Sequence, residues 1–418
     1  MLFCRNSTPN AVGGTGFVCL RIRGGVCFLL SNHKSQYKMN FVKKLSHKIF
    51  FKFKGDIVLT VSFFLCLLTL IFIRSSLKEY VIEYINYSVL SLLFCFMLSV
   101  AGFSKYGLLK RIANTVLSKT KTARIAGLFI ILLTFVASMF LTNDVALITL
   151  IPICLIIFKE AHNQSQLIKI ISLQTISANL GSILTPFGNP QNLFLYSYYN
   201  LNFLEFIKIT IIPTTIGLLL LIISSLLIIP KEITPPRERK NPFAKKKTLF
   251  YGLMFIISLM PIFHIWHYLI SFVIIIISTL IFDRGIFRKI DYGLLLTFIC
   301  FFIFIGNIQK VDLIHNVIKE CLNTSEKVYL LSIGLSQIIS NVPCGILLAH
   351  WTADAKALIL GVNVGGLGSL IASLANVISY NYFKNFRKSQ KNHYIRYFCI
   401  INCVYLLCVL VLVYFIQF

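Results

Sequence analysis

Hydrophobic residues run through most of this chain in long unbroken segments and do not alternate with polar ones. Five of these segments contain no Asp, Glu, Lys or Arg: residues 57–73, 213–229, 267–282, 292–308 and 398–416. A helix needs about 20 mainly apolar residues to cross a hydrocarbon layer about 30 Å thick. The pattern therefore predicts an all-α polytopic membrane protein whose helices contact the lipid bilayer.

Composition agrees with this prediction. Hydrophobic residues make up 57% of the chain and charged residues 13%, whereas soluble domains are about half apolar and about a quarter charged. The formal net charge of +26 comes from short loops beside the apolar segments. The positive-inside rule explains such loops without a nucleic-acid partner, so we predict that the protein binds no nucleic acid.

The loop charges also predict the orientation, because loops rich in Lys and Arg stay in the cytoplasm. The basic loops, predicted to be cytoplasmic, are residues 38–54, 105–124, 230–247 and 384–396, together with the mildly basic 283–291. The loops without a basic excess, predicted to be external, are residues 74–83, 190–205 and 309–327. This alternation gives about nine spans across the cytoplasmic membrane, with the N-terminus in the cytoplasm and the C-terminus outside.

Residues 1–54 form an N-terminal extension that fits neither a span nor a signal peptide. Residues 13–30 are rich in glycine and are interrupted by Arg21 and Arg23, while Met39 opens a basic run leading into the first span. We predict that the extension is disordered or partly a start-site artefact, the latter over residues 1–38.

The two halves of the chain share three ungapped matches in the same order. Residues 85–117 align with 290–322, Thr142-Asn143 with Ser340-Asn341, and 179–196 with 363–380. The predicted repeat one (residues 55–230) begins and ends in the cytoplasm. A linker and one connecting span (231–266) reverse the chain, so repeat two (267–418) begins and ends outside. Inverted repeats place substrate and coupling ions between them near the membrane midplane.

Each repeat is predicted to contain a re-entrant hairpin followed by a broken helix. The second hairpin (residues 328–353) has arms too short to cross the membrane at 1.5 Å per residue, and its counterpart in repeat one is 125–158. The broken helices are 166–197 and 357–383, which Gly, Pro and Asn interrupt. Free backbone groups at this depth are tolerated where they line a wet cavity. Helix N-termini favour an anion there, whereas carbonyl and hydroxyl oxygens favour a cation.

The candidate substrate and ion site consists of residues at the two hairpin tips and the two helix breaks. These are Thr142, Asn143, Asp144, Asn179, Gly181, Thr185, Pro186, Gly188, Asn189, Ser340, Asn341, Val342, Pro343, Asn363, Gly365, Gly366 and Ser369. Residues of these types often only link or pack helices in membranes. The interpretation as a site depends on four motifs at equivalent places in an inverted repeat.

Asp144 is the only acidic residue in the central segments, which are residues 129–158, 174–197, 331–350 and 357–383 and contain no Lys or Arg. A carboxylate within a membrane suggests a functional role by default, because it can carry a proton or bind a cation. The structural alternative is a cap at a helix N-terminus. We expect Na⁺ or H⁺ as the coupling ion and no other cofactor, with Na⁺ near Asp144, Asn179, Asn341 and Asn363.

Four segments resemble the ion transporter superfamily, in the citrate-transporter-like branch that includes sodium–dicarboxylate symporters, arsenite permeases and certain Na⁺/H⁺ antiporters. The segments are FLTNDVALITLIP, QTISANLGSILTPFGNPQNLFLYS, SQIISNVPCGILLA and GVNVGGLGSLIASLA, and the resemblance covers about residues 55–418. They look like an uncharacterised group of bacterial anion permeases.

In dicarboxylate symporters both tips carry Ser-Asn-Thr, which contacts the substrate carboxylate and sodium. Here the tips read Thr142-Asn143-Asp144 and Ser340-Asn341-Val342, so the asparagines correspond, and the acid is closer to arsenite permeases. The resemblance implies that hairpins and broken helices form a transport domain that moves against a scaffold. It also implies that the protein can form a homodimer.

These observations favour a secondary active transporter that moves a small-molecule or inorganic anion, or an oxyacid, by alternating access coupled to Na⁺ or H⁺. Within transport, the alternative is a Na⁺/H⁺ antiporter that uses Asp144. A membrane enzyme is not expected, because the sequence has no paired carboxylates, no metal-ligand spacing and no nucleophile with a base. A non-transporting receptor would need a soluble signalling domain, and no loop is long enough to form one.

Overall fold

The structure is a computed structural model, and by contacts the chain divides into residues 1–60 and 61–418. The described residues are 57–73, 76, 78–108, 111–112, 120, 122–158, 164–230, 244–311 and 320–418, with two short strands near the N-terminus. The strands β1 (Cys19–Arg21) and β2 (Cys27–Leu29) pair antiparallel, with Leu20 opposite Phe28. These two strands depart from the predicted all-α fold. Hydrogen bonds between the paired strands can satisfy backbone N–H and C=O groups without a helix. The rest of the predicted extension lies outside the described residues.

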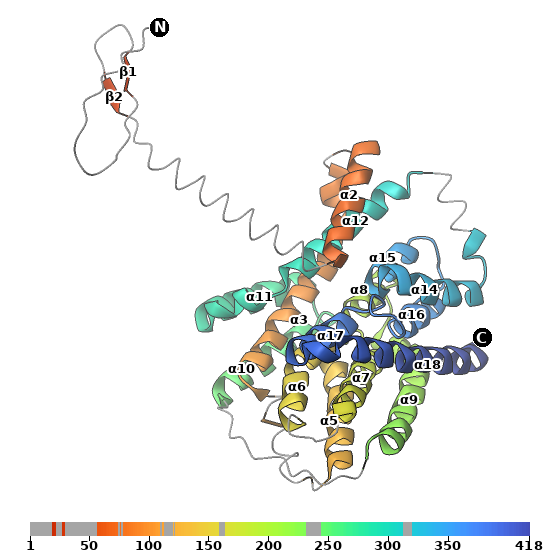
Figure 1. Cartoon of the computed structure of the whole chain (residues 1–418). Coiled ribbons are helices and arrows are strands. Elements are labelled where there is room, and N and C mark those ends of the chain that lie inside the picture. The colour runs from red at the N-terminus through yellow and green to blue at the C-terminus, as the bar shows by residue number, and fades with distance from the viewer. Residues whose placement is uncertain are drawn as a thin grey trace, which may run out of the picture. The chain divides into compact units, whose positions relative to one another are not determined.

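The described part of residues 61–418 consists of helices and their connections (Figure 1). The first ten helices are α2 (Ile57–Phe72, which begins in residues 1–60), η1 (Glu79–Tyr84), α3 (Tyr87–Lys105), α5 (Ala123–Phe140), α6 (Asn143–Ile157), α7 (Gln164–Gly181), α8 (Pro190–Tyr198), α9 (Phe203–Ile228), α10 (Lys245–Leu259) and α11 (Tyr268–Phe282). They are followed by η2 (Arg284–Lys289), α12 (Tyr292–Ile308), α14 (Ser325–Ile339), α15 (Asn341–Ala349), α16 (Ala355–Val364), α17 (Leu374–Phe386), η3 (Lys388–Gln390) and α18 (Lys391–Gln417). This helical architecture is consistent with the predicted polytopic membrane protein.

Several helices expose large apolar side chains, as expected of helices that face lipid. Leu227 on α9 is 78% exposed and Phe415 on α18 is 79% exposed. Within the described residues, three helical segments are long and apolar enough to cross a membrane: Tyr87–Lys105, Phe203–Ile228 and Lys388–Gln417. Six further apolar helices are shorter, and the count of about nine spans stays a prediction.

Two helix pairs lie where the hairpins are predicted. α5 and α6 are joined through Leu141 and Thr142, and α14 and α15 through Ser340 alone. Each pair packs on the helix that follows it along the chain, α5 on α7 and α14 on α16. The breaks between α7 and α8 (residues 182–189) and between α16 and α17 (365–373) fall within the predicted broken helices. Both breaks therefore lie next to a hairpin.

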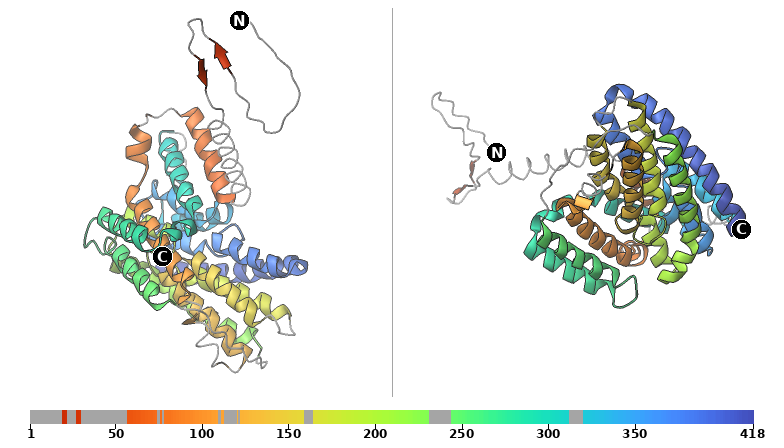
Figure 2. Two further views of the ribbon diagram at one scale, coloured as in Figure 1. Left: turned by 90° about the vertical axis from the view of Figure 1, so that its left-hand side faces the viewer. Right: turned by 90° about the horizontal axis from the view of Figure 1, so that it is seen from below.

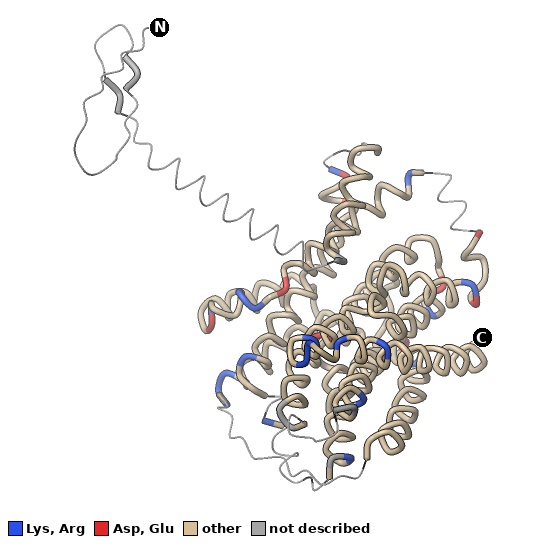
Figure 3. Tube along the Cα trace, in the orientation of Figure 1, with Lys and Arg blue, Asp and Glu red and all other residues tan. Residues whose placement is uncertain are grey.

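The remaining helices pack around these elements. α5, α7 and α9 contact one another and lie side by side, and α18 lies against α7 and α9 (Figures 1 and 2). α3 packs on α10 and α11. The charged residues of the described helices gather at helix ends and connections (Figure 3), as expected where helix interiors face lipid or one another.

Loops that the charge pattern assigns to one side of the membrane contact each other in the structure. Lys105 Nζ lies 2.8 Å from Asp283 Oδ1, which joins two segments predicted to be cytoplasmic. Arg124 Nε, at the end of one such segment, donates at 2.6 Å to the carbonyl of Ile229, which directly precedes another. Lys310 Nζ lies 2.5 Å from Glu79 Oε2, which joins two segments predicted to be external. The Tyr199 hydroxyl, in the third external segment, donates at 2.8 Å to the carbonyl of Thr352 at the end of the second predicted hairpin. The grouping of these loops on the two sides of a membrane stays a prediction.

Single cysteines would test that orientation, and the four positions chosen are all exposed. In a background without native cysteines, we expect cysteine at Lys246 or Asn392 to react with an impermeant maleimide only from the cytoplasm. Cysteine at Asn200 or Asn323 should react only from outside. The measurement is labelling of intact cells compared with inverted vesicles. External labelling at position 246 would contradict the inverted arrangement, because that arrangement requires the linker to face the cytoplasm.

Candidate functional site

The tip of the first hairpin contacts the break that follows α7. Asn143 begins α6, and its backbone N–H donates to the Gly188 carbonyl inside the break at 3.2 Å. Its side-chain Nδ2 donates to Asn179 Oδ1 near the end of α7 at 3.1 Å. The hairpin tip is therefore bonded both to the unwound backbone and to the helix before it.

Side chains replace the helical hydrogen bonds that the first break lacks. Asn192 on α8 donates through Nδ2 to the Ser182 carbonyl at 3.1 Å and to the carbonyls of Ile183 and Thr185 at 3.4 Å. The Thr185 hydroxyl donates to the Met139 carbonyl on α5. These bonds meet the requirement that buried backbone groups be paired, and they fix the break against the hairpin.

Glycine is required at two positions by close backbone approach. A Cβ atom on Gly181 would lie 2.2 Å from the Phe135 carbonyl oxygen, and one on Gly188 would lie 2.3 Å from the Ser182 carbonyl oxygen. Real Cβ contacts are not this short, so a larger residue would force the backbone apart. These two glycines of the candidate site are therefore explained by packing.

The second hairpin and break show the corresponding contacts. The Asn341 backbone N–H donates to the Ala372 carbonyl at 2.9 Å. Asn376 on α17 donates through Nδ2 to the carbonyls of Gly366 at 3.2 Å and Ser369 at 2.8 Å. The Ser369 hydroxyl donates to the Gln337 carbonyl on α14 at 3.2 Å. Each bond joins positions that align with a bonded pair in the first half of the chain.

The two broken helices also bond to each other reciprocally. Asn179 Nδ2 donates to Asn376 Oδ1 at 2.8 Å, and Asn363 Nδ2 donates to Asn192 Oδ1 at 2.7 Å. The alignment pairs Asn179 with Asn363 and Asn192 with Asn376, so each bond is the counterpart of the other. All four side chains are at most 3% exposed. The candidate site therefore has a buried asparagine cluster at its centre.

The two halves of this cluster differ in how they are satisfied. Asn179 Oδ1 accepts from Asn143 Nδ2 and from the Ser373 hydroxyl, both at 3.1 Å. Asn363 Oδ1 is buried and accepts no hydrogen bond from a described residue, and neither amide atom of the buried Gln191 on α8 has a described partner. Leaving such groups unpaired costs about 1–3 kcal/mol each. Asn363 and Gln191 thus carry buried amide oxygens without a described hydrogen-bond partner.

A cavity of about 490 Å³ reaches the first hairpin tip. The polar and charged residues that line it are Ser104, Lys105, Thr142, Asp144, Asn189, Lys289 and Asp291. Asp144 is half-buried in the first turn of α6, while Lys105, Lys289 and Asp291 are exposed. The cavity therefore connects the surface on the predicted cytoplasmic side with the hairpin tip that carries Asp144.

The structure divides the predicted site residues among several places. Thr142, Asp144 and Asn189 line the cavity, whereas Asn341 and Asn363 do not. Pro186 is buried within the first break. Val342 and Pro343 lie in the first turn of α15, where proline is tolerated because its missing N–H would have no helical acceptor. Gly365 packs closely on Ser336, since its Cβ would lie 2.7 Å from that side chain.

Sequence reasoning left several residues of this region out of the candidate site. Asn192 and Asn376 align with each other, and each lies next to a helix break. This correspondence is the sequence signal that could have placed them in the candidate site. Lys105, at the end of α3, and Lys289, at the end of η2, line the cavity from outside the central segments. Their contribution depends on the packing of α3 against η2, which no local pattern predicts.

Residues 49–359 match the model of the citrate transporter family. The chain belongs to the citrate transporter family. It is 39% identical over 269 residues to an uncharacterised transporter of Methanocaldococcus jannaschii, a match that covers 64% of this chain and 73% of that protein. It is 29% identical over 285 residues to the inner membrane protein YbiR of Escherichia coli, covering 68% and 76%.

A shorter match, 30% identical over 149 residues, joins it to the arsB protein of Dictyostelium discoideum and covers 36% of this chain and 26% of that one. These relatives agree with the ion transporter superfamily that the sequence motifs indicate. This member of the citrate transporter family is therefore a membrane transporter and not an enzyme.

Proposed function

We propose that this transporter moves a small anion or oxyacid across the cytoplasmic membrane by secondary active transport, coupled to Na⁺ or H⁺. The observation that carries the proposal is the cavity, which runs from exposed lysines to Asp144 and the first hairpin tip. A cavity with cations at its mouth and one carboxylate at its inner end suits an anion that enters together with a coupling cation.

The proposal includes two inverted repeats and a site that is accessible from the two sides of the membrane in turn. Reciprocal contacts between the two halves of the chain support it, the first being the two asparagine bonds between the broken helices. The second is a pair of salt bridges. Lys105 at the end of α3 pairs with Asp283 before η2, and the aligned Lys310 after α12 pairs with Glu79 at the start of η1. Contacts of this kind are expected when two related halves pack around a pseudo-two-fold axis.

The coupling ion is proposed to bind at both hairpin tips. At the first tip, Asp144 supplies a carboxylate that lines the cavity. Toward the second tip, the buried oxygens of Asn363 and Gln191 accept no hydrogen bond from the described residues. Amide and carboxylate oxygens are suitable ligands for a hard cation, so these residues fit Na⁺, and Asp144 alone would suffice for H⁺.

Uptake into proteoliposomes tests this function. Purified protein would be supplied with labelled dicarboxylates, tricarboxylates and arsenite under an imposed Na⁺ or pH gradient. We expect one of these solutes to accumulate, and accumulation to stop when an ionophore collapses the gradient. Protein-free liposomes are the control. If Na⁺ and H⁺ exchanged across the membrane and no other solute moved, the protein would be a Na⁺/H⁺ antiporter with Asp144 as its carboxylate.

A further inference from the structure

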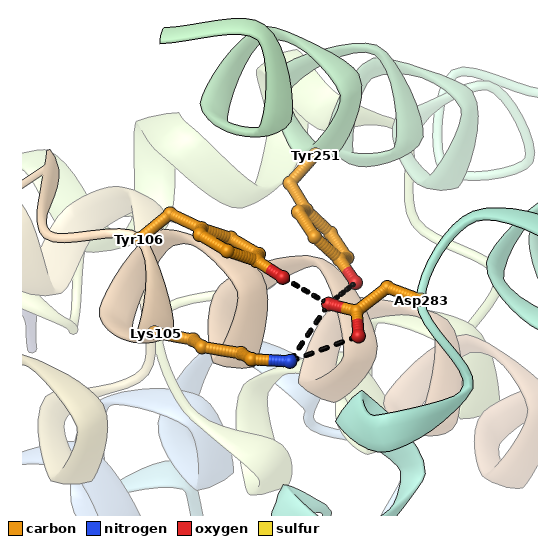
Figure 4. A network of polar contacts seen from close by, with 4 residues as sticks. All are labelled: Lys105, Tyr106, Tyr251 and Asp283. Carbon is orange, nitrogen blue, oxygen red and sulfur yellow. Dashed lines mark hydrogen bonds and ion pairs between the residues drawn. The ribbon is translucent and has the colours of Figure 1, made fainter. Parts of the chain in front are cut away.

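The charged residues at the cavity mouth are not equivalent, because some are already paired. Lys105 Nζ lies 2.8 and 2.9 Å from the two carboxylate oxygens of Asp283, which also accepts from the hydroxyls of Tyr106 at 2.5 Å and Tyr251 at 3.1 Å (Figure 4). Burial raises the pKa of Asp283, but these hydrogen bonds outweigh it and hold the pKa below its usual value. Both groups are therefore charged at neutral pH, and their charges largely cancel.

The acidic residue at the mouth is held in a helix cap. Asp291 Oδ1 accepts from the backbone N–H groups of Gly293 at 2.9 Å and Leu294 at 3.4 Å, at the start of α12. A carboxylate in this position is stabilised by the partial positive charge of the helix N-terminus. Its negative charge is therefore partly neutralised toward the cavity.

Among the described residues that line the cavity, Lys289 is the remaining cation. It ends η2, its side chain is exposed, and it forms no ion pair with any residue that the structure describes. Its neighbour Arg288 is also exposed but does not line the cavity. The two adjacent cations therefore differ in position relative to the cavity and not in charge.

We infer that Lys289 is a specificity-determining residue that concentrates anions at this mouth of the cavity. The inference rests on the proposed function, because it assumes an anionic substrate. An unpaired positive charge at a cleft with low-dielectric walls raises the local concentration of anions and lowers that of cations. The effect should be electrostatic, so it should act on substrate capture and decrease with ionic strength.

The test compares Lys289→Gln with Lys289→Arg and with Arg288→Gln in proteoliposomes. For a divalent anion supplied on the face where the cavity opens, we expect Lys289→Gln to raise the half-saturating concentration by about three- to tenfold. The maximal rate should stay near that of the parent. Lys289→Arg should behave as the parent, and Arg288→Gln should differ from it by less than about twofold. At about 1 M salt, where the Debye length is about 3 Å, the difference should disappear.

Three results would overturn the inference. If Lys289→Gln had parental half-saturation while the parent transported the anion, Lys289 would have no role in selection and the proposed function would stand. If Arg288→Gln had the same effect as Lys289→Gln, the cause would be general surface charge. If the parent moved only cations, both the inference and the proposed function would be wrong.

Discussion

The Asp144→Asn protein should fold and insert like the parent but should not accumulate substrate against a gradient. Asp144 is half-buried in the first turn of α6, and its side chain lines the cavity that reaches the hairpin tip. Asparagine keeps the shape of the side chain but can neither carry a proton nor supply a negative charge to Na⁺. If Asp144 carries the coupling ion, uptake driven by a Na⁺ or pH gradient should fall to background, while substrate exchange at equilibrium can continue.

A purely structural role for Asp144 predicts a different result. An acidic residue in the first turn of a helix contributes about 0.3–1 kcal/mol through the helix dipole, so its loss would reduce stability slightly and leave coupling intact. Asp291→Asn is a suitable control, because Asp291 also lines the cavity and caps a helix, and asparagine caps equally well. Accumulation would be compared for parent and both variants from mildly acidic to mildly alkaline pH. Parental accumulation by Asp144→Asn at every pH would make the carboxylate structural.

The helical elements of the site could be predicted from local sequence. The arms on either side of Ser340 are too short to cross a membrane, and Gly, Pro and Asn interrupt the segment after each hairpin. The structure has helix ends near these places. Such features depend on neighbouring residues, so they are visible along the chain. The inversion of the repeats relative to the membrane stays a prediction.

The contacts that assemble the site could not be predicted in the same way. Lys105 and Asp283 are separated by 178 positions, and Asn179 and Asn376 by 197. The internal alignment related Asn192 to Asn376 but did not indicate that each would bond to a partner in the other broken helix. Which polar side chains face a shared interior depends on helix packing. The candidate list therefore contained the breaks but left out two of the four asparagines that join them.

The side chains of the asparagine cluster differ in how many of their hydrogen-bonding groups have a partner. This difference leads to a second large expected effect. Asn179 donates to Asn376 Oδ1 and to the Gly366 carbonyl and accepts from Asn143 and Ser373. Asn179→Ala should therefore mainly destabilise the protein, since each buried partner left unpaired costs about 1–3 kcal/mol. The measurement is the midpoint of thermal unfolding in detergent. A parental midpoint would show that the cluster does not hold the broken helices together.

Asn363→Ala should instead act on ion binding. Asn363 donates to Asn192 Oδ1 at 2.7 Å and to the Ile359 carbonyl at 2.8 Å, but its buried Oδ1 accepts from no described residue. If that oxygen binds Na⁺, the alanine variant should need at least about tenfold more Na⁺ for half-maximal uptake, a loss of about 1.4 kcal/mol in ion binding. Its unfolding midpoint should fall less than that of Asn179→Ala.

Asn402 on α18 provides the matched control for this measurement. It is fully buried, donates to the carbonyl four residues earlier at 3.0 Å, and also has an Oδ1 without a described partner. Its local chemistry therefore resembles that of Asn363, but it lies outside both broken helices. Asn402→Ala should leave the Na⁺ dependence unchanged. If both variants shifted the Na⁺ dependence equally, the shift would reflect general loosening of the helices, and Asn363 would have no specific role at the ion site.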